Sequence, residues 1–171
     1  VELYPYRELI KNGLASVMVA HLNVPSIEPQ ENYPSSLSEK VVTDILKNQL
    51  KFEGLIFTDA LNMKGASNFK QPGDIDLAAF LAGNDVLLFA ENVPTAIEKF
   101  KQAFKDKLFT EERLAHSVKK ILKYKYKAGL NNYCPIEFEN LYTDLNKKEY
   151  SFILGLYLKS LYFCLYFTSK S

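Results

Sequence analysis

The stretch at residues 54–63 constrains the fold of this chain most, because an apolar run ends there abruptly in a carboxylate. Leu55, Ile56 and Phe57 follow a glycine without interruption, a pattern typical of a parallel strand buried on both faces. In parallel α/β folds the loops at the carboxyl ends of the strands carry the chemistry, so Asp59 is a candidate catalytic carboxylate. An aspartate at this place is also a common helix N-cap or turn residue, and the spacing alone leaves both interpretations open.

Two further segments repeat the order of strand, loop and helix. Residues 14–22 contain a run of apolar side chains that leads into His21, and residues 85–89 form another apolar run. We expect both segments to be strands, the first buried on both faces like the central one. His21 is a candidate site residue because it stands at the end of its strand. A lone histidine there is also a common polar group at the rim of a sheet.

Amphipathic patterns predict helices on either side of these strands. The predicted helices cover residues 4–12, 36–50 and 75–82, a segment that starts near residue 94, and residues 110–129. Between the second and third of them, the glycines and proline of residues 62–73 indicate a rim loop. Ser36 and Glu39 fit a capping box at the start of the second helix, and Thr110 is the predicted N-cap of the last. In that last helix we expect four apolar side chains to face the core: Leu114, Val118, Ile121 and Leu122.

The composition excludes several classes of function. The 171 residues suffice for one domain with a real core, and the net charge of +1 is too small for binding to nucleic acid or an anionic membrane. The lysines at residues 119–127 are most simply a solvated helix face, with a phosphate or nucleic-acid site as the alternative. Cys134 and Cys164 lack the spacing of metal ligands or of a disulfide framework. We therefore predict no metal site and no cofactor.

Both ends of the chain are unusual. Residue 1 is valine and no signal sequence follows, so we expect the chain to begin inside a longer protein or after processing. Residues 151–171 contain no acidic residue and many aromatic ones, and Lys159 interrupts the run, so no stable membrane span is expected. We interpret this tail as the product of a frame change or an incomplete gene. A short amphipathic helix packed on the rest of the chain is the alternative.

Several blocks of sequence, taken together, resemble glycoside hydrolase family 3. In order they are Met18-Val19-Ala20-His21, Pro34-Ser35-Ser36-Leu37-Ser38, residues 52–63, residues 82–88 and residues 117–122. The chain resembles the C-terminal part of that family's N-terminal (β/α)8 barrel, closest to its β-N-acetylhexosaminidase branch. The resemblance implies an α/β fold and a partial TIM barrel, with three βα units that correspond to strands six to eight. It covers residues 1–133, followed by a linker at 134–150 and the atypical tail at 151–171.

The resemblance also assigns roles to individual residues. Asp59 matches the family's catalytic nucleophile, which in a retaining glycosidase attacks the anomeric carbon while an acid protonates the leaving oxygen. Thr58 and Asn62 are candidates for supporting its charge. His21 and Met63 are candidate substrate-binding residues, although filling the core is the commoner use of a methionine. The implied substrate is a glycan with terminal β-linked N-acetylglucosamine, and a β-glucoside is the close alternative.

The family's acid/base residue has no counterpart in this sequence. In the hexosaminidase branch it is a His-Asp pair on the loop after the fifth strand, and in two-domain glucosidases it comes from a following domain. Neither His21 nor His116 stands at a matching position. We therefore predict a fragment that is inactive alone. A non-catalytic carbohydrate-binding relic and an independent α/β domain remain as alternatives. Family members suggest the bacterial periplasm, envelope or cytoplasm, and the oligomeric state stays open.

Overall fold

The computed structural model describes residues 2–135 and 138–146, in two compact units, Val1–Gly129 and Leu130–Ser171. The elements of the first unit are α1 (Tyr4–Lys11), β1 (Ser16–Val19), η1 (Ser35–Leu37), η2 (Lys40–Gln49), β2 (Leu55–Thr58), α2 (Lys64–Ser67), α3 (Asp74–Ala82), α4 (Val93–Lys105) and α5 (Glu111–Lys127). The second unit contains η3 (Leu130–Asn132) and α6 (Leu141–Leu145). The predicted tail at 151–171 lies outside the described residues. Within the described part, no helix is long and apolar enough to cross a membrane.

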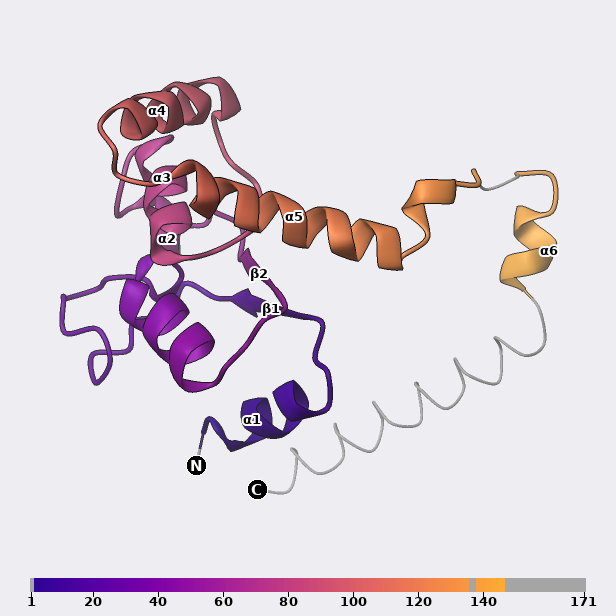
Figure 1. The fold of residues 1–171 in the computed structure, drawn as a ribbon, viewed down its shortest axis with the longest axis horizontal. Helices are drawn as coiled ribbons and strands as arrows, with labels where there is room; N and C mark the ends of the chain where they lie inside the picture. The colour runs from indigo at the N-terminus through magenta and orange to yellow at the C-terminus, as the bar shows by residue number, and fades with distance from the viewer. Residues whose placement is uncertain (1, 136–137, 147–171) are drawn as a thin grey trace. The chain divides into compact units, whose positions relative to one another are not determined.

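β1 and β2 form a parallel pair, in which Ser16 lies opposite Leu55 and Val19 opposite Thr58 (Figure 1). The prediction of a strand buried on both faces is confirmed for most of β2, where Leu55, Ile56 and Thr58 are buried. The same prediction is wrong for β1, because only Val19 is buried and Met18 is 55% exposed. The difference arises because η2 covers the side of β1 that Val17 and Val19 face, while Met18 points the other way.

The predicted strand at residues 85–89 is wrong as a strand, although the segment does run beside β2. Val86 makes a single parallel bridge with Phe57, and its carbonyl accepts from the Thr58 N–H at 3.0 Å. Beyond it the Leu88 N–H donates to the Thr58 hydroxyl at 2.9 Å instead of to a backbone carbonyl, and Phe89 has a φ of 56°. The Thr58 hydroxyl, which takes the place of a backbone acceptor, and the left-handed conformation of Phe89 thus end the pairing with β2 after one bridge.

The second helix begins differently from its predicted capping box. Ser36 belongs to η1, and the side chain that caps the following helix is Ser38, whose Oγ accepts from the Val41 N–H at 3.4 Å. The helix that follows, η2, is π-helical. The predicted rim loop at residues 62–73 contains the short helix α2. The Thr110 cap of α5 is confirmed, because its hydroxyl accepts from the Arg113 N–H at 3.3 Å.

Three apolar clusters make up the core of the first unit. The first cluster joins the sheet to η2 and includes Val19, Val42, Leu46, Phe52 and Ile56. The second joins η1 to α3 and includes Leu37, Leu61 and Ile75. The third joins α3 to α4 and to the segment after α4, through Phe80, Ala103 and Phe109. Gly83, at the end of α3, has a φ of 120°, and a Cβ there would lie 2.5 Å from the Thr43 hydroxyl. Only glycine therefore lets α3 approach η2 this closely.

The inward face of α5 is polar, which corrects the predicted apolar stripe. Leu114, Val118 and Leu122 are exposed, the last by 58%, whereas Ser117 is buried. Figure 1 shows α5 as the long helix that begins beside α3. Arg113 donates there to the carbonyls of Phe80, at 3.1 Å, and of Asn84, at 2.9 Å. The residues that hold this helix in place therefore lie at positions 113, 117 and 120, which share one helical face.

Asp85 is the centre of this polar contact. Its side chain is fully buried and accepts from Lys120 Nζ at 2.6 Å, Ser117 Oγ at 2.6 Å and the Ile56 N–H at 3.1 Å. Burial by itself raises the pKa of Asp85, but these hydrogen bonds and the Lys120 charge outweigh it and hold the pKa below its ordinary value. Lys47, which donates to the Gly83 carbonyl, has its pKa lowered to about 8 by burial and by the nearby charges of Arg113 and Lys120.

We predict that Asp85→Asn lowers the free energy of unfolding by on the order of 3 kcal/mol, because it leaves Lys120 buried without its counter-charge. Urea denaturation at pH 7 measures the change. Because the pKa of Asp85 is lower in the folded chain than in the unfolded chain, its contribution is present above pH ~4 and is lost as the pH falls below that value through the lower pKa of the folded chain. The stabilities of the two proteins should therefore converge in acid.

Glu98→Gln is the matched control, since it removes one carboxylate from an exposed pair with Lys101 on α4. It should leave the urea midpoint nearly unchanged. An Asp85→Asn protein as stable as the unmodified chain at pH 7 would show that the ion pair does not hold α5 in place.

Candidate active site

Asp59 leaves the carboxyl end of β2 and remains attached to the sheet. Its N–H donates to the Val19 carbonyl of β1 at 3.0 Å, so the pairing of the strands extends one residue beyond β2. Its Oδ1 accepts from the Ala60 N–H at 2.8 Å. The side chain is partly buried. A partly open carboxylate that accepts a backbone N–H is suited to act as a charged nucleophile.

His21 comes from the neighbouring strand end and contacts the same loop. Its Nε2 lies 2.9 Å from the Ala60 carbonyl and its Nδ1 lies 2.6 Å from Ser36 Oγ. A carbonyl only accepts, so Nε2 carries a proton and donates to Ala60. In the neutral ring Nδ1 then accepts from the Ser36 hydroxyl. His21 and Asp59, which are 38 positions apart in the sequence (59 − 21), are thus joined through a single residue, Ala60.

Two adjacent serines hold the backbone around His21. Ser35 Oγ donates to the Ala20 carbonyl at 2.6 Å and accepts from the Leu22 N–H at 3.2 Å, so it contacts the residues on both sides of His21. Ser36 is fully buried, and its carbonyl accepts from Asn84 Nδ2 at 2.8 Å. The sequence pattern predicts Ser36 as a helix cap and does not reveal these roles. The only signal in the sequence was the resemblance of this block to the family.

The other predicted residues are placed as follows. Met63 is 48% exposed, so it does not fill the core, and its N–H donates to the Ala60 carbonyl at 3.0 Å. Thr58 is buried and its hydroxyl accepts from Leu88, while Asn62 is exposed. The hydrogen bond to Asp59 Oδ1 comes from the Ala60 N–H, and neither Thr58 nor Asn62 supplies it. In the described part of the chain, no group of acidic, histidine and cysteine side chains could hold a metal ion.

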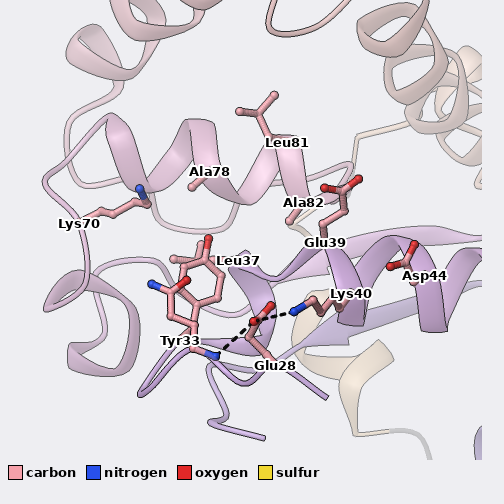
Figure 2. Close-up of a pocket in the computed structure, with 11 residues that line it drawn as sticks. Glu28, Tyr33, Leu37, Glu39, Lys40, Asp44, Lys70, Ala78, Leu81 and Ala82 are labelled. Carbon is pink, nitrogen blue, oxygen red and sulfur yellow. Dashed lines mark hydrogen bonds and ion pairs between the residues drawn. The ribbon is translucent and has the colours of Figure 1, made fainter. Parts of the chain in front are cut away.

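A cavity of about 650 Å³ lies between α3 and the segment from Glu28 to Asp44 (Figure 2). Glu28 accepts there from Ser38 Oγ at 2.8 Å and from Lys40 Nζ at 3.2 Å, and the Ser38 hydrogen bond holds the pKa of Glu28 below its ordinary value. None of the three predicted site residues lines this cavity. Its wall is formed by η1, η2, α3 and the loops that precede them, and it does not include the strand ends that carry Asp59 and His21.

Comparison with known proteins identifies the family to which this chain belongs. Residues 1–124 match the model of the glycosyl hydrolase family 3 N terminal domain. The chain therefore belongs to glycoside hydrolase family 3, which confirms the family predicted from the sequence and its α/β fold. The number of barrel strands that the chain supplies stays a prediction.

Individual relatives point to one branch of the family. A beta-hexosaminidase of Nitrosomonas eutropha is 36% identical over 57% of this chain and 27% of its own length. A beta-N-acetylglucosaminidase/beta-glucosidase of Cellulomonas fimi is 28% identical over 74% of this chain and 24% of its own length. The solved family 3 beta-N-acetylglucosaminidase of a Paenibacillus species matches 81% of this chain and 27% of its own, with 30% identity and a TM-score of 0.74. The chain thus spans about a quarter of the length of these relatives.

The His21 contacts lead to a spectroscopic prediction. We expect the Nε2–H of His21 to give a direct signal in a ¹H–¹⁵N spectrum at pH 8, because its hydrogen bond to Ala60 slows exchange with water. His116 is exposed on α5 and serves as the internal control, which should give no such signal. A ring proton of His21 on Nδ1 instead of Nε2 would contradict the geometry.

Proposed function

We propose that this chain supplies the nucleophile of a retaining β-N-acetylhexosaminidase, and that Asp59 is that nucleophile. The observation that carries the proposal is the position of Asp59 at the carboxyl end of β2, held by Val19 and Ala60 within the residues that match the family. The names of the relatives support terminal β-linked N-acetylglucosamine as the substrate. The double name of the Cellulomonas fimi relative favours a β-glucoside as the second candidate.

In the proposed reaction the ionised Asp59 attacks the anomeric carbon and forms a glycosyl ester as the bond to the leaving oxygen breaks. Water then hydrolyses this ester and regenerates the carboxylate. The hydrogen bond from the Ala60 N–H would fix one carboxylate oxygen and leave the other for the attack. Met63, which follows on the same loop and is half exposed, is proposed to contact the sugar ring.

We infer that the acid which protonates the leaving oxygen lies outside these 171 residues. The proposal that the units correspond to strands six to eight of the barrel places that acid on an earlier loop or on another domain. Loss of a general acid typically costs about 10² to 10⁴ in rate with a basic leaving group. The chain alone should therefore not turn over a substrate with an ordinary alcohol as leaving group.

An activated substrate separates the nucleophile from the missing acid. Dinitrophenolate is so weakly basic that it departs without protonation, so 2,4-dinitrophenyl N-acetyl-β-glucosaminide tests Asp59 alone. We predict release of dinitrophenolate by the chain, and a loss on the order of 10⁴-fold or more in Asp59→Asn. The release is followed by absorbance, with the corresponding β-glucoside in parallel to decide between the two sugars.

Asp44→Asn is the matched control, because Asp44 is an exposed carboxylate on η2 and does not belong to either strand end. It should release dinitrophenolate at the rate of the unmodified chain. Equal release by the Asp59→Asn protein would show that another group attacks and would overturn the proposal. Absence of release from the unmodified chain would favour the non-catalytic relic.

A further inference from the structure

We propose that His21 is a positioning residue, which fixes the side chain of Asp59 through the backbone of Ala60 and does not itself bind the sugar. The inference rests on the proposed role of Asp59 and replaces the sequence-based assignment of His21 to substrate binding. Its basis is a continuous chain of hydrogen bonds that runs from Asn84 through Ser36, His21 and Ala60 to Asp59.

The Ala60 peptide units carry the link. The Ala60 N–H donates to Asp59 Oδ1 at 2.8 Å, and its carbonyl accepts from His21 Nε2 at 2.9 Å and from the Met63 N–H at 3.0 Å. The Ala60 N–H and carbonyl belong to successive peptide units, so the backbone angles of Ala60 couple the His21 bond to the direction of the N–H, which in turn holds the Asp59 carboxylate. Without the His21 bond, the Ala60 carbonyl keeps, among the described residues, a bond from the Met63 N–H of its own loop. The peptide unit that contains this carbonyl is also held by the Leu61 N–H, which donates to the Leu88 carbonyl at 2.9 Å, so His21 adds the contact to the end of β1.

His21 is suited to this role because contacts from η1 and from the loop at Ala60 hold its ring and backbone. Its ring contacts the fully buried Ser36, and Ser35 holds the backbone before and after it. On α2 the glycine at position 65 lies so close that a Cβ there would be 3.1 Å from the Cβ of His21. A partly buried side chain held by these contacts can transmit the rigidity of the β1 end to the neighbouring loop.

The same contacts leave His21 without a ring nitrogen for a substrate. Nε2 donates to Ala60, and Nδ1 is 2.6 Å from Ser36 Oγ. A sugar hydroxyl could bind the ring only after one of these bonds broke. Loss of His21 should thus slow the covalent step and leave substrate affinity nearly unchanged, whereas a sugar-binding histidine would show the opposite pattern.

Three variants of the full chain separate the two ring nitrogens. His21→Gln keeps an amide N–H near the position of Nε2 and loses Nδ1. His21→Asn keeps a polar group near the position of Nδ1 and loses the bond to Ala60. His21→Phe keeps the ring volume and loses both. The first readout is the set of three-bond couplings between the Asp59 backbone and its carboxyl carbon, which report the χ1 rotamer without any substrate.

We expect one Asp59 rotamer in the unmodified chain and in His21→Gln, and averaging over rotamers in His21→Asn and His21→Phe. The rate of dinitrophenolate release at saturation should fall about 10-fold or more in the last two variants, with the half-saturating concentration changed less than about 2-fold. Circular dichroism and the amide spectrum outside residues 58–63 verify that each variant is folded. If His21→Phe does not fold, the Asn and Gln pair decides the question.

Asp59 couplings that are the same in all variants would overturn the inference, as would a raised half-saturating concentration with an unchanged rate. The coupling measurement is independent of activity. Suppose that the couplings are averaged in His21→Asn and His21→Phe while the unmodified chain releases no dinitrophenolate. That result would support the positioning role and reject the proposed function. Release of dinitrophenolate that depends on Asp59 but not on His21 would support the proposed function and reject the positioning role.

Discussion

The parallel pairing of β1 with β2 is the contact on which the rest of the structure depends. It extends one residue past β2, where the Asp59 N–H reaches the Val19 carbonyl, and so brings the ends of both strands to one edge. Because this register is fixed, His21 can bind the Ala60 carbonyl while Asp59 binds the Ala60 N–H. A slip by one residue would turn both Ile56 and Thr58 to the other face of the sheet and break the contact between the two loops.

Two polar networks serve the opposite ends of this small sheet. At the start of β2 the buried Asp85 accepts from Ile56, Ser117 and Lys120, and with Arg113 it holds α5 in place. At the other end Ser36, His21 and Ala60 hold the carboxylate proposed to react. Asn84 lies beside both, since its side chain donates to Ser36 and its carbonyl accepts from Arg113. The contacts that stabilise the fold and those that support the proposed chemistry thus lie at opposite ends of the same two strands, as in parallel α/β barrels.

The features that sequence reasoning predicted correctly depend on short-range physics. The apolar run of β2, the Thr110 cap and the placement of Asp59 at a strand end follow from neighbouring residues. The errors have long-range causes. The inward face of α5 is polar because Asp85, far away in the sequence, attracts Ser117 and Lys120, and residues 85–89 fail to form a strand because Thr58 supplies a side-chain acceptor. The link from His21 to Ala60 joins two loops, so no local pattern could have revealed it. The predicted roles of Asp59, His21 and Met63 toward a substrate stay predictions.

The central claim is that Asp59 attacks the sugar, and the most direct measurement is the mass of the peptide that carries the glycosyl ester. The chain is exposed to a 2,4-dinitrophenyl glycoside with fluorine on the sugar ring, which slows hydrolysis of the intermediate, and is then quenched in acid and digested. We predict one added sugar on the peptide that contains Asp59, and fragmentation should locate the sugar at that residue. A sugar attached to any other carboxylate, with Asp59 unmodified, would contradict it.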